Sequence, residues 1–303
     1  MRKISLLLMT FLVLILVVVG CSKSSGGKSD VIKIGSWSTS EHLILSHMIK
    51  LVIEQETDLK TEIVEGLTST PVVLEAMESN EIQISSVRYV GTDISSSLQI
   101  DDAPRDPEEA LKIVQEGLLE KYDQKFYDSY GFENTYVFTV RQDLADELGL
   151  EKVSDVADHA GDLHLGTDNA WLERPNDGYP AFKEMYNMEF GKTSPMEIGV
   201  VYKAVNNQDV DIVLAYSTDA RLKEYDLKTL EDDQNFFPPY QAAPVVRNDL
   251  LENHPEVDEA ISMLIGKIDT ETMTELNYLG DIEKIQPAEI AENYLKEIGL
   301  LKD

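Results

Sequence analysis

Four tyrosines lie at the ends of segments that the sequence predicts to be strands or stiff loops. They are Tyr89, Tyr136, Tyr216 and Tyr240. A cation over an aromatic ring gains about 0.5–1 kcal/mol at an exposed site and about 2 kcal/mol or more when desolvated. A quaternary ammonium has no hydrogen-bond donor, so ring faces are the means of recognising it. Together the four rings indicate an aromatic cage, although core or surface packing is the usual role of any one of the 13 tyrosines.

Residues 82–93, which read I-Q-I-S-S-V-R-Y-V-G-T-D, contain the first of these rings. Their apolar residues predict a buried strand, and we expect Val90-Gly91 to end it in a turn. In open α/β sheets, ligands bind beyond the carboxyl ends of the strands. We therefore expect a ligand near Tyr89, the hydroxyl of Thr92 and the carboxylate of Asp93.

Polar side chains at helix starts are candidates for the other end of a ligand, because helix N-termini present free N–H groups and a dipole that favours an anion. Ser38 and Ser69 lie where strands of the first half give way to helices. Capping, worth about 1 kcal/mol, is the alternative role for both. We assign capping to Ser38 and expect Ser69, with Thr92, to face the ligand. Arg88 is assigned to a structural ion pair and Trp171 to a core.

Other chemistries have no support in the spacing of reactive residues. The five histidines form no H-x-x-x-H or H-E-x-x-H pair, so no zinc site is predicted. The sequence has no G-x-G-x-x-G and no G-x-S-x-G motif. We therefore expect no metal, no cofactor and no catalytic residues, and a protein that is not an enzyme.

The N-terminus has the features of a secretory signal. Basic residues precede an apolar run from Ile4 to Val19, which is short for a membrane span of about 20 residues. The sequence V-V-G-C follows and resembles the lipobox of bacterial lipoproteins, which implies acylation of Cys21. A transmembrane anchor is the alternative, but Cys21 is the only cysteine and no disulfide framework explains it. We expect a signal peptide at 1–20 and a lipidated cysteine with a flexible linker at 21–30.

The chain is strongly acidic. It has 56 Asp and Glu against 26 Lys and Arg, a formal net charge of −30. Such a surface does not neutralise phosphates, which argues against nucleic acid as a partner. It is compatible with attraction of a small cation, and equally with a solvated surface that has no partner.

Strands alternate with helices along the chain, which predicts an α/β fold with mostly parallel sheets. In the first half we expect strands at 31–36 and 61–64, a helix that starts at a capping box at 38–41, and a helix that starts at Pro71. A second alternating series begins near Tyr127. Its expected strands are 136–141, 163–167 and 211–216, and its expected helices are 143–148, 181–190 and 199–206.

Two lobes of ordinary domain size are expected. Residues 31–126 together with 232–303 would form lobe I, and residues 127–231 would form lobe II. Residues 232–244, rich in proline and aromatics, predict an irregular crossing between them. The tail predicts helices at 255–268, 270–278 and 287–298.

Five segments carry a resemblance to a known family. They are S-Y-G-F-E-N-T-Y (129–136), D-N-A-W-L (168–172), L-A-Y-S-T-D-A-R (214–221), F-F-P-P-Y (236–240) and I-G-K-I-D-T-E-T-M-T-E-L-N-Y (265–278). From about Ile32 to the C-terminus, the chain resembles the substrate-binding lipoproteins of bacterial glycine betaine/carnitine/choline ABC transporters. The resemblance implies a two-lobed periplasmic-binding-protein fold of type II. It also implies a cage of four tyrosines for the ligand headgroup, at Tyr89, Tyr136, Tyr216 and Tyr240.

Three positions bear on the ligands that this resemblance implies. After the first cage tyrosine, Asp is associated with choline-restricted members and Thr with promiscuous ones, so Thr92 favours a broad range. Where some members carry a glutamine that reaches a ligand carboxylate, this chain has Trp37, which we expect to narrow or line the pocket instead. Ser69 aligns near another polar pocket position.

The resemblance implies a receptor that captures quaternary ammonium solutes (glycine betaine, carnitine, choline) for osmoprotection. It would be lipid-anchored on the outer face of the cytoplasmic membrane of a Gram-positive cell and serve ABC permease and ATPase subunits. Three alternatives are open: a receptor for another small amine or amino acid, a sensor without transport, and a surface enzyme acting on choline esters.

Overall fold

A computed structural model describes residues 31–101, 103–174 and 178–302. The expected signal peptide, Cys21 and the linker lie outside the described residues. Chain contacts separate a compact unit that begins at Ile32, and this unit is described below. Among the described residues, no helix is long and apolar enough to cross a membrane.

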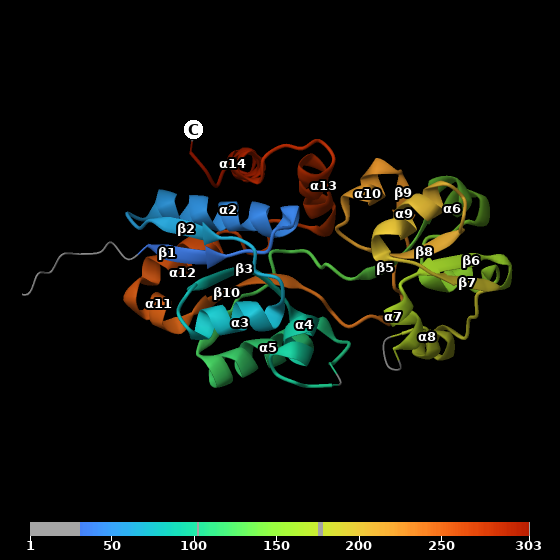
Figure 1. Ribbon diagram of the computed structural model, residues 1–303, viewed down its shortest axis with the longest axis horizontal. Coiled ribbons are helices and arrows are strands. Elements are labelled where there is room, and N and C mark those ends of the chain that lie inside the picture. The colour runs from blue at the N-terminus through green and yellow to red at the C-terminus, as the bar shows by residue number, and fades with distance from the viewer. Residues whose placement is uncertain (1–30, 102, 175–177, 303) are drawn as a thin grey trace, which may run out of the picture. The chain divides into compact units, whose positions relative to one another are not determined.

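The described residues form two five-stranded sheets. The first comprises, in hydrogen-bonded order, β2 (Thr61–Val64), β1 (Ile32–Gly35), β3 (Ile84–Tyr89), β10 (Ala242–Arg247) and β4 (Gln124–Phe126) (Figure 1). β1 pairs in parallel with β2 and β3. β10 is antiparallel to both β3 and β4. Four strands therefore run in one direction and β10 alone opposes them.

Helices cover both faces of this sheet. The adjacent residues Val245 and Val246 of β10 belong to different buried clusters, because successive side chains of a strand point to opposite faces. One cluster includes residues of α2 (Ser40–Glu56), α12 (Pro255–Ser262), α13 (Thr270–Asp281) and α14 (Pro287–Glu297). The other includes residues of α3 (Thr70–Glu78), α4 (Val90–Ser96) and α5 (Pro107–Tyr122). A short helix, α11 (Asn248–Asn253), follows β10.

The second sheet repeats this plan with β7 (Lys192–Pro195), β6 (His164–Thr167), β8 (Ile212–Tyr216), β5 (Tyr136–Arg141) and β9 (Leu227–Thr229). β6 is parallel to β7 and β8, and β5 is antiparallel to β8 and β9. Aromatic residues, among them Phe138, Trp171 and Phe182, fill one of its cores. Its helices are α6 (Gln142–Leu148), α7 (Asn169–Glu173), α8 (Tyr179–Tyr186), α9 (Ile198–Asn206) and α10 (Ala220–Glu224), with 3₁₀ turns at Val153–Val156 and Ala160–Asp162.

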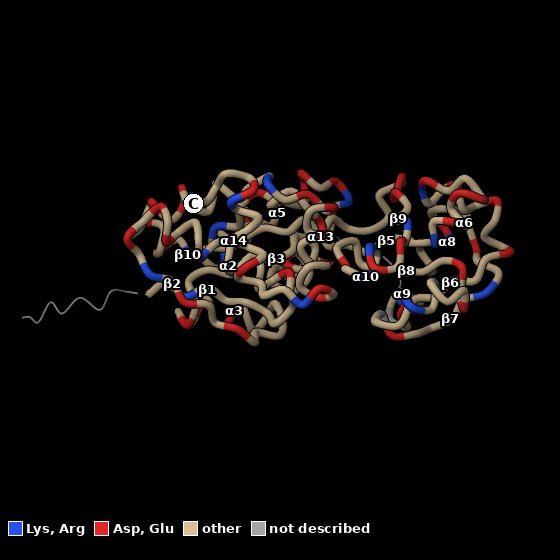
Figure 2. Tube along the Cα trace, turned by 90° about the horizontal axis from the view of Figure 1, so that it is seen from above, with Lys and Arg blue, Asp and Glu red and all other residues tan. Residues whose placement is uncertain are grey.

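The predicted α/β class is confirmed, with two sheets of mostly parallel strands flanked by helices. The chain passes between the sheets twice, at residues 127–135 and 230–241, and these passages are the green and orange segments between the two groups of labels in Figure 1. The lobe boundaries expected after residues 126 and 231 stay a prediction. Acidic residues, drawn red, occur throughout the described part of the trace, around both sheets (Figure 2).

Several predicted element boundaries are wrong. A helix, α4, begins at Val90, directly after β3, where a turn was expected. α8 ends at Tyr186 rather than at residue 190, because Asn187 adopts a left-handed conformation, with a φ of 47°. α12 ends at Ser262, and β10 begins inside the segment expected to be irregular. Four strands, β4, β7, β9 and β10, were not predicted. β4, β7 and β9 have only three or four residues and no apolar alternation, and a proline interrupts the apolar run of β10.

Candidate ligand-binding site

One cavity of about 520 Å³ contains all four tyrosines of the predicted cage. Tyr89 is the last residue of β3, and Tyr240 lies in the second passage between the sheets. Tyr136 and Tyr216 come from the second sheet. Trp37 and Thr92 line the same cavity. Segments that are far apart in the sequence thus meet around one space, whose volume suits a small ligand.

Strand pairing places two of the rings together. Tyr136 in β5 and Tyr216 in β8 are directly opposite partners of an antiparallel pair, so their side chains lie on the same face. Their ring centroids are 5.1 Å apart and the ring planes differ by 26°. Burial first, and then the neighbouring Tyr216, raise the pKa of Tyr136, which keeps this phenol neutral. The pair offers an aromatic wall without a charge.

A glycine lets the fourth ring approach the first sheet. A Cβ atom on Gly91 would lie 3.2 Å from the Tyr240 ring and 2.9 Å from the Pro239 carbonyl oxygen. The Gly91 N–H donates to that same oxygen at 3.0 Å. The absence of a side chain at this position therefore permits the contact between the start of α4 and the Tyr240 ring.

A buried carboxylate holds the hydroxyl of the first ring. The Tyr89 hydroxyl donates to Glu41, the second residue of α2, and burial, then Glu41, raise the pKa of this phenol. Asn134 and Asn277 donate to the same carboxylate at 3.1 and 3.2 Å. Glu41 was expected to close a capping box with Ser38, and that prediction is wrong. The N-cap of α2 is Thr39, with no side-chain cap.

A histidine and a tryptophan stack beside the first ring. Trp37 and His42 are parallel within 6°, with centroids 4.7 Å apart, and His42 meets the Tyr89 ring edge-on at 6.0 Å. Burial lowers the pKa of His42 to about 3, so this imidazole is neutral. One ring nitrogen, Nδ1, lies 2.7 Å from the Thr39 hydroxyl. The stack is an uncharged aromatic surface at this end of the cavity.

Of the polar residues that were predicted to face a ligand, only some line the cavity. Thr92, in the first turn of α4, lines the cavity. Ser69 is not among the residues that line it, and its hydroxyl is the N-cap of α3, accepting from the Val72 N–H at 3.5 Å. Asp93, expected near a ligand, is fully buried instead and pairs with Arg88. The ion pair predicted for Arg88 and the core position predicted for Trp171 are confirmed.

Sequence reasoning missed several residues in the cavity wall. Arg174 lines the cavity with its guanidinium carbon 5.4 Å from the centre of the Tyr136 ring. Glu41, His42 and Asn134 line it too. Asn134 was inside a segment quoted for its resemblance, and Glu41 was assigned to helix capping. The sequence around Arg174 carries no motif that would have singled it out.

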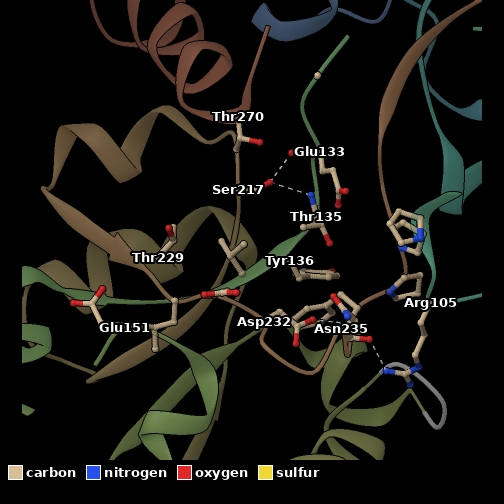
Figure 3. A pocket seen from close by; sticks show the side chains of 18 residues that line it. Arg105, Glu133, Thr135, Tyr136, Glu151, Ser217, Thr229, Asp232, Asn235 and Thr270 are labelled. Carbon is tan, nitrogen blue, oxygen red and sulfur yellow. Dashed lines mark hydrogen bonds between the residues drawn. The ribbon is translucent and has the colours of Figure 1, made fainter. Parts of the chain in front are cut away.

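A second cavity, of about 620 Å³, shares Thr135 and Tyr136 with the first. Figure 3 shows its lining, in which Ser217 bonds to Glu133 and Thr135. Asp232 there already accepts from the Tyr186 hydroxyl at 2.6 Å. Because only one of the four predicted tyrosines lines it, the smaller cavity is the candidate site. Among the described residues, no group of His, Cys, Asp or Glu could hold a metal ion.

A comparison with family models identifies what kind of protein has this cavity. Residues 30–297 match the OpuAC model, the substrate-binding domain of ABC-type glycine betaine transport systems. The chain belongs to this family. It is therefore an extracellular substrate-binding protein of an ABC importer, which works with permease and ATPase subunits, and it is not an enzyme. Its two sheets are those of a type II periplasmic-binding-protein fold.

Individual relatives support the family assignment. The chain is 44% identical over 272 residues to the carnitine transport binding protein OpuCC of Listeria monocytogenes, covering 90% of this chain and 88% of that protein. It is 31% identical over 287 residues to a glycine-betaine-binding protein of Pseudomonas aeruginosa, covering 91% and 90%. A crystal structure described as a glycine betaine/carnitine/choline ABC transporter superposes with a TM-score of 0.86 at 45% identity, covering 89% of this chain and 100% of that one.

Proposed function

We propose that this protein captures glycine betaine, carnitine and choline in a cage formed by Tyr89, Tyr136, Tyr216 and Tyr240. The observation that carries the proposal is that these four rings line one cavity. A trimethylammonium group offers no donor to a polar site, whereas it gains about 2 kcal/mol or more over a desolvated aromatic face. The names of the two relatives, which bind carnitine and glycine betaine, support this ligand class.

The other end of the ligand would lie toward Arg174 and Thr92. Arg174 is the one Lys or Arg among the described residues that line the cavity, so a ligand carboxylate would gain most from its guanidinium. The Thr92 hydroxyl can accept or donate a hydrogen bond, which suits both a carboxylate and the hydroxyl of choline. Ser69 caps α3 in this structure, so it would contact the ligand only after a movement that brings the start of α3 to the cavity.

The protein would act at the outer face of the cytoplasmic membrane of a Gram-positive cell. An acylated Cys21 would hold it there, and residues 22–30 would be a flexible linker. Captured solute would pass to the permease and accumulate in the cell as an osmoprotectant. Metabolic labelling with a fatty acid analogue tests the anchor: Cys21→Ser should lose the label, and an equally labelled variant would refute acylation at this residue.

A titration with matched pairs of ligands tests the cage. Glycine betaine and glycine differ only in the three methyl groups on nitrogen, as do choline and ethanolamine. The purified protein should bind the methylated member of each pair and bind its partner at least about 100-fold more weakly, because a primary ammonium loses more hydration when it enters a ring cage. The proposal would be refuted if neither glycine betaine nor choline showed saturable binding by calorimetry.

A receptor for a primary amine is the second candidate. Glu41 favours it, because this buried carboxylate lines the cavity and could accept hydrogen bonds from an ammonium group. In that case glycine or ethanolamine would bind more tightly than the methylated ligand of the pair. The same titration therefore separates the two candidates.

A further inference from the structure

Glu41 is a buried carboxylate in the wall of the proposed cage. The residue is 5% exposed. Its oxygens accept hydrogen bonds from the Tyr89 hydroxyl, from Asn134 Nδ2 at 3.1 Å and from Asn277 Nδ2 at 3.2 Å. All three donors are neutral, so they hold the carboxylate in place without cancelling a negative charge. Burying a carboxylate is costly unless it is hydrogen-bonded, and here the bonds are present.

Each of the three donors belongs to a segment that carries a cage tyrosine or is bonded to one. Tyr89 is itself part of the cage. Asn134 lies two residues before Tyr136 in the chain. Asn277 also donates to the Thr218 carbonyl oxygen at 2.9 Å, and Thr218 lies two residues after Tyr216. One carboxylate therefore joins the segments of three of the four rings.

The described residues that line the cavity include one cation, Arg174, and three carboxylates, Glu41, Asp219 and Asp281. Asp219 accepts hydrogen bonds from the Arg221 side chain at 2.7 and 2.5 Å, which offset its charge, and Asp281 is exposed to solvent, which screens its charge. The charge of Glu41 is thus the buried negative charge that a ligand would meet at the Tyr89 end of the cavity.

We propose that Glu41 is a positioning and specificity-determining residue, which orients the cage rings and favours ligands with a net positive charge over zwitterions. The inference rests on the proposed function. Choline has an ammonium and no carboxylate, so it gains the whole attraction of Glu41. Glycine betaine gains the same attraction at its ammonium but meets repulsion at its carboxylate. Removing the charge should therefore weaken choline more than glycine betaine.

The dissociation constants of choline and glycine betaine for wild type, Glu41→Gln and Glu41→Asp test this inference by calorimetry. Glu41→Gln keeps the size of the side chain and removes its charge. It should raise the ratio of the choline constant to the glycine betaine constant about tenfold, as expected for partly screened charges in a protein interior. Glu283→Gln is the matched control: Glu283 also accepts from a tyrosine hydroxyl, that of Tyr278 at 3.2 Å, but it is exposed and outside the cavity.

Glu41→Asp separates orientation from charge. It keeps the carboxylate but shortens the side chain by one methylene, so it should weaken both ligands by a similar factor and leave their ratio near the wild-type value. This result also decides the positioning role if Glu41→Gln does not fold. Unchanged binding of both ligands by Glu41→Asp would overturn that role, and an unchanged ratio in folded Glu41→Gln would overturn the selection by charge. Failure of wild type to bind either ligand would instead refute the proposed function, on which the inference rests.

Discussion

Trp37 and His42 lie face to face in the wall of the cavity, with their ring centroids 4.7 Å apart. His42 also meets the edge of the Tyr89 ring. A tryptophan at this position thus contacts Tyr89 through an imidazole rather than offering a polar group to a ligand. The stack has consequences for both spectroscopy and stability.

Ligand binding should be visible in the emission of one tryptophan alone. Trp37 and Trp171 are the two tryptophans of the chain, and Trp171 is fully buried among the aromatics of the second sheet. We expect glycine betaine to change the fluorescence of the Trp171→Phe variant, which retains Trp37, and to leave that of Trp37→Phe nearly constant. If instead the fluorescence of Trp37→Phe changed and that of Trp171→Phe stayed constant, the ligand would alter the surroundings of Trp171 rather than those of Trp37. Calorimetry on both variants controls for loss of binding.

The neutral His42 should make stability depend on pH. Burial lowers the pKa of His42 to about 3 in the folded chain, whereas an unfolded histidine titrates near 6.5. Between these values the unfolded state binds a proton that the folded state does not, so stability is fully present above about pH 7 and falls as the pH falls. Lowering the pH from 7 to 5 should cost about 2 kcal/mol through this residue.

Urea unfolding of wild type and His42→Phe measures this contribution. Phenylalanine keeps a ring to stack on Trp37 and removes the titrating group. His47 and His164 also have a pKa lowered first by burial, so the wild-type slope contains their contributions too. The difference between the two proteins isolates His42. Equal pH slopes for both would show that the imidazole is protonated in the folded state.

Much of the fold could be predicted, because long elements have a strong apolar period. β5 was expected at its observed bounds, 136–141, and α9 and α13 were expected within a few residues. Short strands were not predicted because pairing with a neighbouring strand, rather than their own sequence, determines their conformation. β4, for example, has three residues and pairs with β10. The start of α4 at Val90 was not predicted, because a glycine at position 91 is typical of a turn. In the structure, Gly91 lies in the helix, and its close packing against Tyr240 requires a residue without a side chain.

The rings of the site could be proposed from the sequence, but its charges could not. Tyrosines at strand ends are recognisable from strand patterns, and the sheet then brings Tyr136 and Tyr216 together. Glu41 and Arg174 line the cavity only because of the tertiary fold, and the sequence around each of them does not predict that position. The S-x-x-E pattern at the start of α2 resembles a capping box, but the Glu41 side chain accepts from the Tyr89 hydroxyl instead.

Substituting Gly91 should disturb the Tyr240 ring. In Gly91→Ala the new methyl group would lie 2.9 Å from the Pro239 oxygen and 3.2 Å from the ring. Overpacking costs about 1–3 kcal/mol, partly offset by about 1 kcal/mol because alanine favours the helix more than glycine does. We expect a small change in unfolding free energy but about tenfold weaker ligand binding, since about 1.4 kcal/mol corresponds to a factor of ten.

Gly161→Ala is the control for this substitution, because a Cβ atom there meets nothing within 4 Å. It should leave ligand affinity unchanged in the same calorimetric assay. If Gly91→Ala binds as tightly as this control, the contact between Gly91 and Tyr240 does not set the shape of the cage.

The Tyr216 ring should matter more than its hydroxyl. Tyr216→Leu removes a ring face from the cavity and the stack on Tyr136, so it should weaken choline binding about 5- to 30-fold, equivalent to about 1–2 kcal/mol. Tyr216→Phe keeps the ring and should change affinity about twofold or less. Competition against a fluorescent quaternary ammonium compares the two variants. Equal losses would show that the hydroxyl, and not the ring face, contacts the ligand.

The buried Arg88–Asp93 pair should stabilise the segment that carries Thr92. Both side chains are nearly inaccessible, with 2% and 0% exposure, and Ser97 donates to Asp93 at 2.6 Å. Asp93→Asn leaves the Arg88 charge buried without its counter-ion, so the unfolding free energy in urea should fall by about 3–5 kcal/mol. Asp249→Asn, which breaks a pair with Arg247 that is partly exposed, should cost about 1 kcal/mol or less. Similar losses in both variants would mean that water reaches Arg88 once Asp93 is replaced, and the start of α4 would then be held by packing rather than by the ion pair.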